Sequence, residues 1–304
     1  MENFWRMLGV QGTLFVYMAV GYGLRKLHMI TDEARKGLSD LLLYVLLPCM
    51  IFASFQNGLP LEKLISGGLM LAVSCFICLV AWALGKLLWR RYPPERAVIL
   101  RYGTLIANAG FAGMAVVQGA YGEEGVLLAS LFIIAIRVLM WSAGVAMFST
   151  AKNEHAMRDV LLNPGILATA AGLVWGLLYL PTPAFLGTAI TRLGDCTAPL
   201  SLVMVGAILA DVELRGVFER DALLASAVRL LLMPAIVVAI MKPLGFPELH
   251  IVIAAVLTGM PIGSTTAILA QKYGADARFG SQCVFVSTVG SLFTVPLLTL
   301  LVRM

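Results

Sequence analysis

Residues 64–88 read LISGGLMLAVSCFICLVAWALGKLL, and the one charged residue in this run is Lys86, close to its end. An apolar segment of about 18 residues or more is long enough to cross the hydrocarbon core of a bilayer, roughly 30 Å thick, as a helix. A strand of a membrane barrel would instead alternate between polar and apolar residues, and this run does not. The segment therefore predicts a transmembrane helix, and it guides the interpretation of the sequence on both sides of it.

The whole chain has the composition of a membrane protein. Of its 304 residues, 60% are hydrophobic and 13% are charged, which is too little charge for the surface of a soluble domain of this size. Inside lipid the backbone must satisfy its own hydrogen bonds, so a chain of apolar runs folds into helices. We predict an all-α integral membrane protein with about ten transmembrane helices, at residues 7–28, 36–57, 62–89, 96–119, 123–150, 163–181, 184–211, 220–241, 248–272 and 276–302.

The distribution of basic residues predicts the orientation in the membrane. In the ten-helix arrangement, fifteen of the 22 Lys and Arg residues lie at the helix ends on one side and five on the other. Because the basic side of a membrane protein faces the cytoplasm, we expect both termini outside and a multi-pass location in the cytoplasmic membrane. The same charges sit at helix ends rather than on one face, which argues against nucleic acid as a partner and leaves the lipid bilayer.

The two halves of the chain carry similar features in the same order. Pro48 and Pro199 are 151 residues apart, and the pairs at 121–122 and 273–274, both Tyr-Gly, are 152 residues apart. This spacing predicts a first five-helix repeat at 1–151, a short cytoplasmic linker at 152–162, and a second repeat at 163–304. Five is an odd number, so the second repeat must be inverted relative to the first, as in many secondary transporters.

The fourth and ninth predicted helices contain residues that interrupt a helix. The fourth contains NAGFAG (108–113) and the ninth TGMPIGSTT (258–266). Glycine permits irregular dihedral angles and proline removes a backbone donor, so both helices are predicted to be broken near the middle of the membrane. Backbone groups freed by such a break are tolerated where they line a cavity, and the start of each resuming half-helix favours an anion. The alternative is that these small residues only allow close packing. The predicted substrate-binding residues are Asn108, Gly110, Gly113, Gly259, Pro261, Gly263, Ser264 and Thr265.

Three charged residues within predicted spans need an explanation, and for one of them, Arg229, which is nearer a helix end than Arg137, we favour a structural role. Arg137 is near the middle of the fifth helix, too far from either surface to reach water along the bilayer normal. It is either a counter-charge for an anionic substrate or a structural cation bound to the carbonyls of a broken helix. Asp195 precedes Pro199 by four residues, and we expect it to be buried there. It is either a proton carrier or the fixed partner of Arg137 or Arg192, and with Thr197 it forms the predicted ion- or proton-coupling site.

Enzymes and metal proteins are disfavoured by what the sequence lacks. It has no P-loop, and no nucleophile–base pair is visible. The five cysteines lie in apolar segments, and the three histidines, at positions 28, 155 and 250, are far apart in sequence. The sequence therefore predicts no catalytic residue, no metal site and no cofactor beyond coupling to protons or sodium ions.

Several stretches together resemble the auxin efflux carrier family. They are VGYGLRKL (20–27), EARKGLS (33–39), LLPCMIF (46–52), the NAGFAG stretch, YGEEG (121–125) and TAPLSLVMVG (197–206). The resemblance covers nearly the whole chain and places it near the sodium–bile acid symporters. It implies ten helices in two inverted repeats, outside termini, and helices 4 and 9 crossing at a central substrate site that includes Asn108 and Pro261. Members of this family often form homodimers, so the resemblance also implies a homodimer as one expected assembly. The chain lacks the long central loop of the plant exporters, so it is similar to the compact prokaryotic branch.

The sequence thus predicts alternating-access transport of a small mono- or dicarboxylate, similar to auxin or malonate. Helices 1, 2, 6 and 7 would form a scaffold against which the crossing helices move. A sodium-coupled symporter of the bile-acid type is one alternative, for which Asp195, Thr197 and Ser201 would supply oxygen ligands. A membrane receptor with a transporter fold is another.

Overall fold

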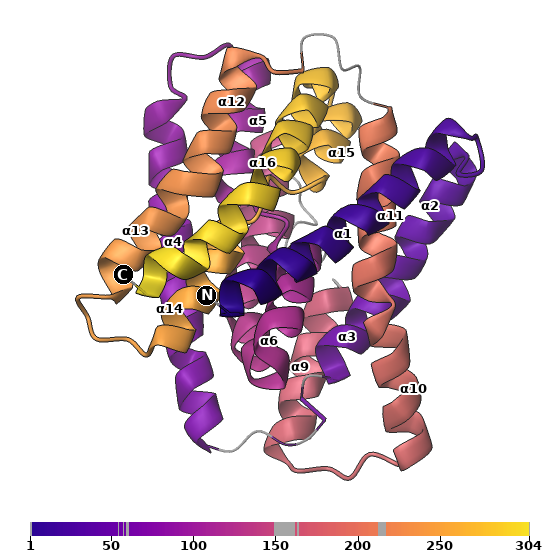
Figure 1. Ribbon diagram of the computed structural model, residues 1–304, viewed down its shortest axis with the longest axis vertical. Helices are drawn as coiled ribbons and strands as arrows, with labels where there is room; N and C mark the ends of the chain where they lie inside the picture. Colours follow the sequence, from indigo (N-terminus) through magenta and orange to yellow (C-terminus); the bar gives the residue numbers. More distant parts are fainter. Residues whose placement is uncertain are drawn as a thin grey trace.

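The computed structural model describes residues 2–53, 55–56, 58, 61–148, 162, 164–211 and 217–303. Figure 1 shows its arrangement of helices, among which π-helical turns are labelled η. The first half contains α1 (Glu2–Lys26), α2 (Asp32–Leu41), η1 (Leu42–Leu46), α3 (Leu47–Ala53), α4 (Leu61–Leu88), α5 (Pro94–Leu105), η2 (Ala109–Gly113), α6 (Met114–Leu139), η3 (Met140–Gly144) and α7 (Val145–Phe148). The second half contains α9 (Pro164–Leu177), α10 (Ala184–Asp195), α11 (Thr197–Ala210), α12 (Arg220–Ala227), η4 (Val228–Leu232), α13 (Met233–Met241), α14 (Glu248–Thr258), α15 (Thr265–Lys272) and α16 (Ala277–Arg303).

Proline and glycine set many of the helix boundaries. Helices α5 and α9 begin at Pro94 and Pro164, because a proline at the first helical position loses no intrahelical hydrogen bond. Within α6 the helix is interrupted at Gly122, which has φ +61°, and Gly274 beyond α15 has φ +72°. A side chain would be strained at both positions. The two Tyr-Gly pairs of the predicted repeat therefore both end helices, while the inverted repeat itself stays a prediction.

Two of the π-helical turns precede prolines that the sequence places inside spans. Turn η1 ends two residues before Pro48, and η4 ends two residues before Pro234. Proline removes a backbone N–H and its ring crowds the preceding turn, so the helix widens instead of keeping its regular bonding. The helical path continues through both sites, so the segments at 32–53 and 220–241 are each continuous and long enough to cross a membrane.

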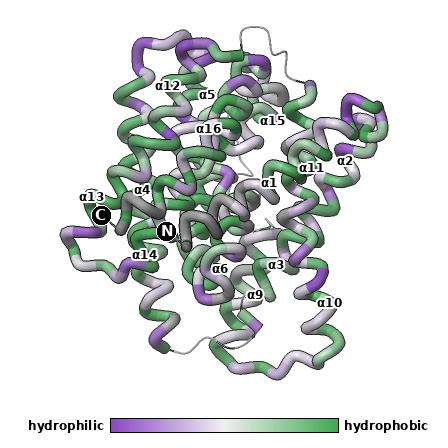
Figure 2. The backbone as a smooth tube through the Cα atoms, viewed as in Figure 1, coloured by the Kyte–Doolittle hydropathy of each residue, from purple (hydrophilic) through white to green (hydrophobic). Residues whose placement is uncertain are grey.

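The described helices are those of a multi-pass membrane protein. Figure 2 shows hydrophilic residues gathered at the turns and hydrophobic residues along the helices. Phe76 and Leu79 of α4 and Phe293 of α16 are more than half exposed, as expected for side chains that face lipid. By length and composition, five described helical segments can cross a membrane: Asp32–Ala53, Leu64–Leu88, Ala184–Ala210, Arg220–Met241 and Ala277–Leu298. The predicted linker at 152–162 lies outside the described residues except for Leu162.

The helices pack in two groups (Figure 1). A scaffold group contains α1, α2, α3, α9, α10 and α11, in which α1 packs along α11 and α3 packs between α9 and α10. A crossing group contains α4, α5, α6 and α12 to α16. Helix α14 lies at its centre and is buried on all sides from Ile251 to Thr258. The scaffold group contains the segments that the sequence assigned to helices 1, 2, 6 and 7.

Candidate functional site

The first crossing helix is broken at residues 106–108. Helix α5 ends at Leu105, and Ile106 adopts an extended conformation with φ −105° and ψ 113°. Helical bonding resumes when the Gly113 N–H donates to the Asn108 carbonyl at 3.1 Å. Asn108 therefore stands at the start of the resuming helix, and its side chain is buried. The structure places the break where the sequence predicted it.

The second crossing helix is broken at residues 259–264. Helix α14 ends at Thr258, and α15 begins at Thr265. Gly259, Pro261 and Gly263 lie within this irregular segment and are buried. The Gly259 backbone has φ −82° and ψ 6°, outside the regular helical values. The predicted break in the ninth helix is therefore also present.

The two breaks pair with each other. Ala107 and Ile262 form an isolated antiparallel bridge. The Asn108 N–H donates to the Pro261 carbonyl at 2.8 Å, and the Gly263 N–H donates to the Ile106 carbonyl at 3.2 Å. Backbone groups that the interrupted helices cannot satisfy thus satisfy one another, as a buried site requires. The segments from the two halves of the chain cross at this bridge.

Side chains from neighbouring helices hold the crossing. The Ile262 N–H donates to the Ser287 hydroxyl of α16 at 3.0 Å. Arg229, in η4 and 2% exposed, donates from Nη1 to the Thr104 carbonyl at 2.7 Å and from Nε to the Met260 carbonyl at 3.3 Å. Those carbonyls belong to the last turn of α5 and to the second break. Arg229 is therefore a clamp between both broken helices, which agrees with the structural role that the sequence analysis favoured for it.

Arg137 lies beside the first break without such partners. It is 6% exposed, and its Nη1 has no hydrogen-bond partner within the part of the chain that the structure describes. No carboxylate within the described part of the chain forms an ion pair with it. A Cβ added to Gly110 would lie 3.9 Å from Arg137 Nη2, so the guanidinium reaches the predicted site residues. A buried cation with an unused donor is costly, and an anion beside it would lower that cost.

The remaining predicted site residues have mixed surroundings. A Cβ at Gly113 would lie 2.9 Å from Leu257 of α14, so this glycine also permits close packing of the crossing helices. Ser264 and Thr265 are half-buried at the start of α15. The Thr265 hydroxyl is hydrogen-bonded to the Tyr102 hydroxyl at 3.0 Å. The neighbouring Thr266 hydroxyl is buried and has no hydrogen-bond partner among the described residues.

The predicted coupling residues Asp195 and Thr197 are not brought together. Asp195 ends α10 with its side chain exposed, so the expectation that it is buried is wrong. Thr197 begins α11 and is fully buried, and none of the described residues forms a hydrogen bond with its hydroxyl. Cys196, between Asp195 and Thr197, keeps a near-helical conformation, so two side chains that are two positions apart point to different sides. Within the described residues, Asp195 pairs with neither Arg137 nor Arg192.

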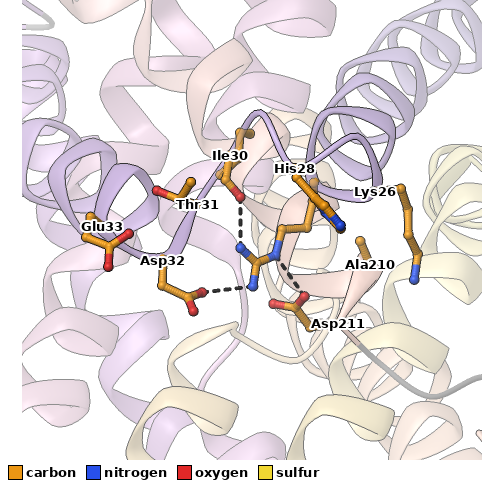
Figure 3. A pocket seen from close by; sticks show the side chains of 9 residues that line it. Lys26, His28, Ile30, Thr31, Asp32, Glu33, Ala210 and Asp211 are labelled. Atoms are coloured by element: carbon orange, nitrogen blue, oxygen red, sulfur yellow. Dashed lines mark hydrogen bonds and ion pairs between the residues drawn. The ribbon is translucent and has the colours of Figure 1, made fainter.

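A cluster of charged residues joins the ends of three scaffold helices. Arg25 at the end of α1 donates at 2.8 Å to Asp32, to Asp211 and to the Ile30 carbonyl (Figure 3). Arg35 also donates to Asp211, at 2.8 Å. The cluster borders an open pocket of about 370 Å³. Its basic groups are occupied by the chain's own carboxylates, so it serves to connect helices.

A second cluster joins helices of the crossing group. Arg96 at the start of α5 contacts Glu219, Asp221 and Asp276, which lie close to the starts of α12 and α16. Tyr92, in the turn before α5, donates to Asp221 at 3.1 Å, and burial raises the pKa of its hydroxyl. Each cluster connects helices of one packing group.

Comparison with known proteins gives consistent results over the full chain. The family model described as "Membrane transport protein" matches residues 12–299. An "Uncharacterized transporter" of Methanothermobacter thermautotrophicus is 27% identical over 293 residues, covering 94% of this chain and 95% of the relative. A "Putative malonate transporter" of Rhizobium meliloti is 24% identical over 302 residues, covering 95% and 93%. The "Uncharacterized transporter YfdV" of Escherichia coli is 21% identical over 303 residues, covering 93% and 94%.

Proposed function

The chain belongs to the membrane transport protein family, and from that premise we propose that it is a secondary transporter for a small organic anion. It would work by alternating access in the cytoplasmic membrane, with both termini outside. The family membership establishes a multi-pass membrane transporter rather than an enzyme. The anion, the site and the mechanism are inferred from the arrangement at the crossing.

The observation that carries the proposal is the position of Arg137 beside the paired helix breaks. Arg229 is buried to almost the same extent, but its guanidinium donates hydrogen bonds to two backbone carbonyls. These carbonyls lie at the ends of helical segments, which carry partial negative charge. Arg137 has an unused donor at the first break. A carboxylate accepts hydrogen bonds from a guanidinium at two oxygens, which makes arginine suited to bind it.

The backbone at the crossing adds to this preference for an anion. The resuming helix after Asn108 and α15 both begin at the crossing, and the start of a helix carries partial positive charge. Asn108 and Thr265 would add side-chain donors. A mono- or dicarboxylate similar to auxin or malonate fits these groups, and the name of the Rhizobium relative agrees with a dicarboxylate.

Alternating access would follow from movement between the scaffold and crossing groups. Each charge cluster fastens helices within one group, which leaves the two groups able to move as bodies. A sodium-coupled mechanism is less well supported. The oxygen ligands proposed for sodium included Asp195 and Thr197, which face different sides of the scaffold.

The test is uptake of labelled carboxylates into proteoliposomes with imposed proton or sodium gradients. We expect accumulation of a carboxylate by the natural chain and its loss in Asn108→Ala. Gln118→Ala is the matched control, because this amide lies on α6 but is exposed. Accumulation driven only by sodium would favour the symporter alternative. Ligand binding without flux under any gradient would contradict the carrier and favour a receptor.

A further inference from the structure

The hairpin of α4 and α5 carries basic side chains that the charge clusters do not use. Lys86, Arg90, Arg91 and Arg101 form no ion pair with any described residue. Arg96, on the same hairpin, is by contrast paired with three carboxylates of the crossing group. Arg101 is five residues beyond Arg96, and at about 100° per residue it points roughly 140° away from it around α5. The two arginines therefore face different surroundings.

Lys86 and Arg101 lie close together, one on each helix. A Cβ added to Gly85 would lie 3.5 Å from the Cα of Arg101, so α5 packs against α4 at that glycine. Gly85 directly precedes Lys86, so both basic side chains leave the backbone within one helical turn of each other. Arg101 is half-buried, and its Nε is enclosed without a hydrogen-bond partner in the described part of the chain. An anion between the two side chains would satisfy this N–H group and neutralise both charges.

These two charges lie at the level of lipid headgroups. Lys86 is two residues from the end of α4, and Arg101 is roughly 10 Å along α5 from Pro94. The Lys86 ammonium group lies 3.6 Å from the centre of the Trp82 ring, and Trp82 is 42% exposed. Tryptophan side chains favour the boundary between headgroups and acyl chains, so this cation–π contact places Lys86 at that boundary.

An apolar stripe continues from Lys86 along α4 toward the middle of the membrane. Phe76, Leu79 and Ala83 are exposed, and together with Lys86 they fall within a sector of about 80° around the helix axis. This face of α4 therefore has a cation near its end and hydrocarbon side chains below it. A soluble anion would use only the charged part of this surface, whereas a phospholipid would use both parts.

We propose that the α4–α5 hairpin binds one anionic phospholipid, with its phosphate between Lys86 and Arg101 and its acyl chains along the stripe of α4. An arginine donates two parallel hydrogen bonds to phosphate oxygens, and the lysine adds a second charge. Arg90 and Arg91, beyond the end of α4, add to the attraction for a headgroup with net negative charge. A zwitterionic headgroup brings its own ammonium group, which these side chains repel. The bound lipid would anchor the crossing group at one membrane surface.

Quenching of tryptophan fluorescence by brominated lipids tests the site at Trp82. The full chain is placed in bilayers of phosphatidylcholine and phosphatidylglycerol in which either one or the other lipid carries bromine. The signal of Trp82 is the part that is lost in Trp82→Phe. We expect this residue to associate with phosphatidylglycerol at least about tenfold more strongly than with phosphatidylcholine, because two basic side chains meet the headgroup. Equal quenching by the two lipids would overturn the proposal.

Substitutions of the two basic residues then locate the headgroup. Lys86→Gln and Arg101→Gln should each reduce the preference for phosphatidylglycerol about fivefold, the effect of one basic residue at an anionic surface. Lys242→Gln is the matched control, because this lysine in the turn after α13 is exposed and forms no ion pair with a described residue. A preference that survives both substitutions, or that falls equally in the control, would contradict the site.

Salt provides a second measurement that needs no substitution. The preference of the natural chain for phosphatidylglycerol should shrink in about 1 M salt, where charges are screened beyond roughly 3 Å. Quenching of Trp82 by brominated phosphatidylcholine should change little, since the apolar stripe is insensitive to screening. A preference that is the same at low and high salt would show that headgroup charge does not cause it, and would overturn the proposal.

Discussion

Arg137 and Arg229 show how one residue type can serve two purposes at the same depth. Both guanidinium groups are buried beside the broken helices. Arg229 donates to carbonyls of both broken helices and so stabilises their crossing. Arg137 keeps a buried nitrogen without a partner. The difference lies in which backbone groups each side chain can reach, and it leads to predictions of opposite sign.

Replacing Arg137 by an apolar residue should stabilise the protein while removing its transport. In Arg137→Met the unpaired charge disappears from an apolar interior, and such replacements often stabilise by about 1–4 kcal/mol. Carboxylate uptake should fall at least about tenfold, because a charge-assisted hydrogen bond is lost. Thermal unfolding in detergent and uptake in proteoliposomes measure the two effects. A lower melting temperature would show that Arg137 is structural.

The same substitution at Arg229 should destabilise the protein. Arg229→Met leaves the carbonyls of Thr104 and Met260 without this donor, and we expect a loss of about 2–4 kcal/mol from the two bonds to a charged group. The same thermal unfolding assay measures this loss. Arg229→Lys is the control, since it keeps the charge but can reach fewer acceptors, and it should fall between the natural chain and the methionine variant. A methionine variant as stable as the natural chain would exclude the clamp.

At the scale of elements, close packing depends on glycines at helix crossings. In the pair of α1 and α11, a Cβ at Gly21 would overlap the Val203 carbonyl, and a Cβ at Gly206 would overlap the Met18 carbonyl. The backbones of the two helices therefore touch at two places. Small residues allow this approach in membranes, where packing contributes much of the association between helices.

Adding a methyl group at this crossing should therefore separate the two helices. We expect Gly21→Ala to destabilise the protein by about 1–3 kcal/mol, the usual cost of overpacking, as measured by thermal unfolding. Gly23→Ala, two residues further along α1, is the matched control, because a Cβ there meets no atom within 4 Å. Alanine also has the better helix propensity, so the control should gain stability, by up to about 1 kcal/mol. Similar effects at both positions would show that the crossing is not the cause.

The crossing itself is also a property of elements. The bridged residues Ala107 and Ile262 are 155 positions apart in sequence, yet their pairing satisfies backbone groups of both broken helices. Each break would be costly alone in hydrocarbon, where water cannot replace the lost hydrogen bonds. The pairing makes both breaks tolerable and places Asn108 and Pro261 next to each other.

At the scale of the whole molecule, charge clusters fasten the ends of the helices. Asp211 is central to the scaffold cluster because it accepts a hydrogen bond from Arg25 (Figure 3) and another from Arg35. Its side chain is 40% exposed, so the ion pairs are screened by water and salt.

Neutralising Asp211 should loosen the scaffold in a salt-dependent way. We expect Asp211→Asn to lower the free energy of unfolding by about 1 kcal/mol at low ionic strength. The loss should shrink in about 1 M salt, where charges are screened beyond roughly 3 Å. Thermal unfolding at both salt concentrations measures this effect, with Asp40→Asn on the exposed side of α2 as the control. An equal loss at both concentrations would indicate that the ion pairs are not responsible.

The sequence by itself determined the class of protein and the places where its helices break. Long apolar runs can be stable only as helices in lipid, and glycine and proline interrupt helices through their own covalent geometry, whatever surrounds them. The breaks at Asn108 and at Pro261 follow from such local rules. The resemblance over the whole chain gave the family, which the comparisons confirm.

The tertiary structure decided which polar residues meet. Arg137, Asp195 and Arg229 looked alike in sequence, as charges within apolar segments. The surroundings of a side chain depend on the direction in which its helix faces, and helix packing sets that direction. Arg229 was turned toward carbonyls from both halves, Arg137 toward Gly110, and Asp195 toward the outer surface. Partners that lie more than a hundred residues away cannot be found from the spacing of residues along one helix.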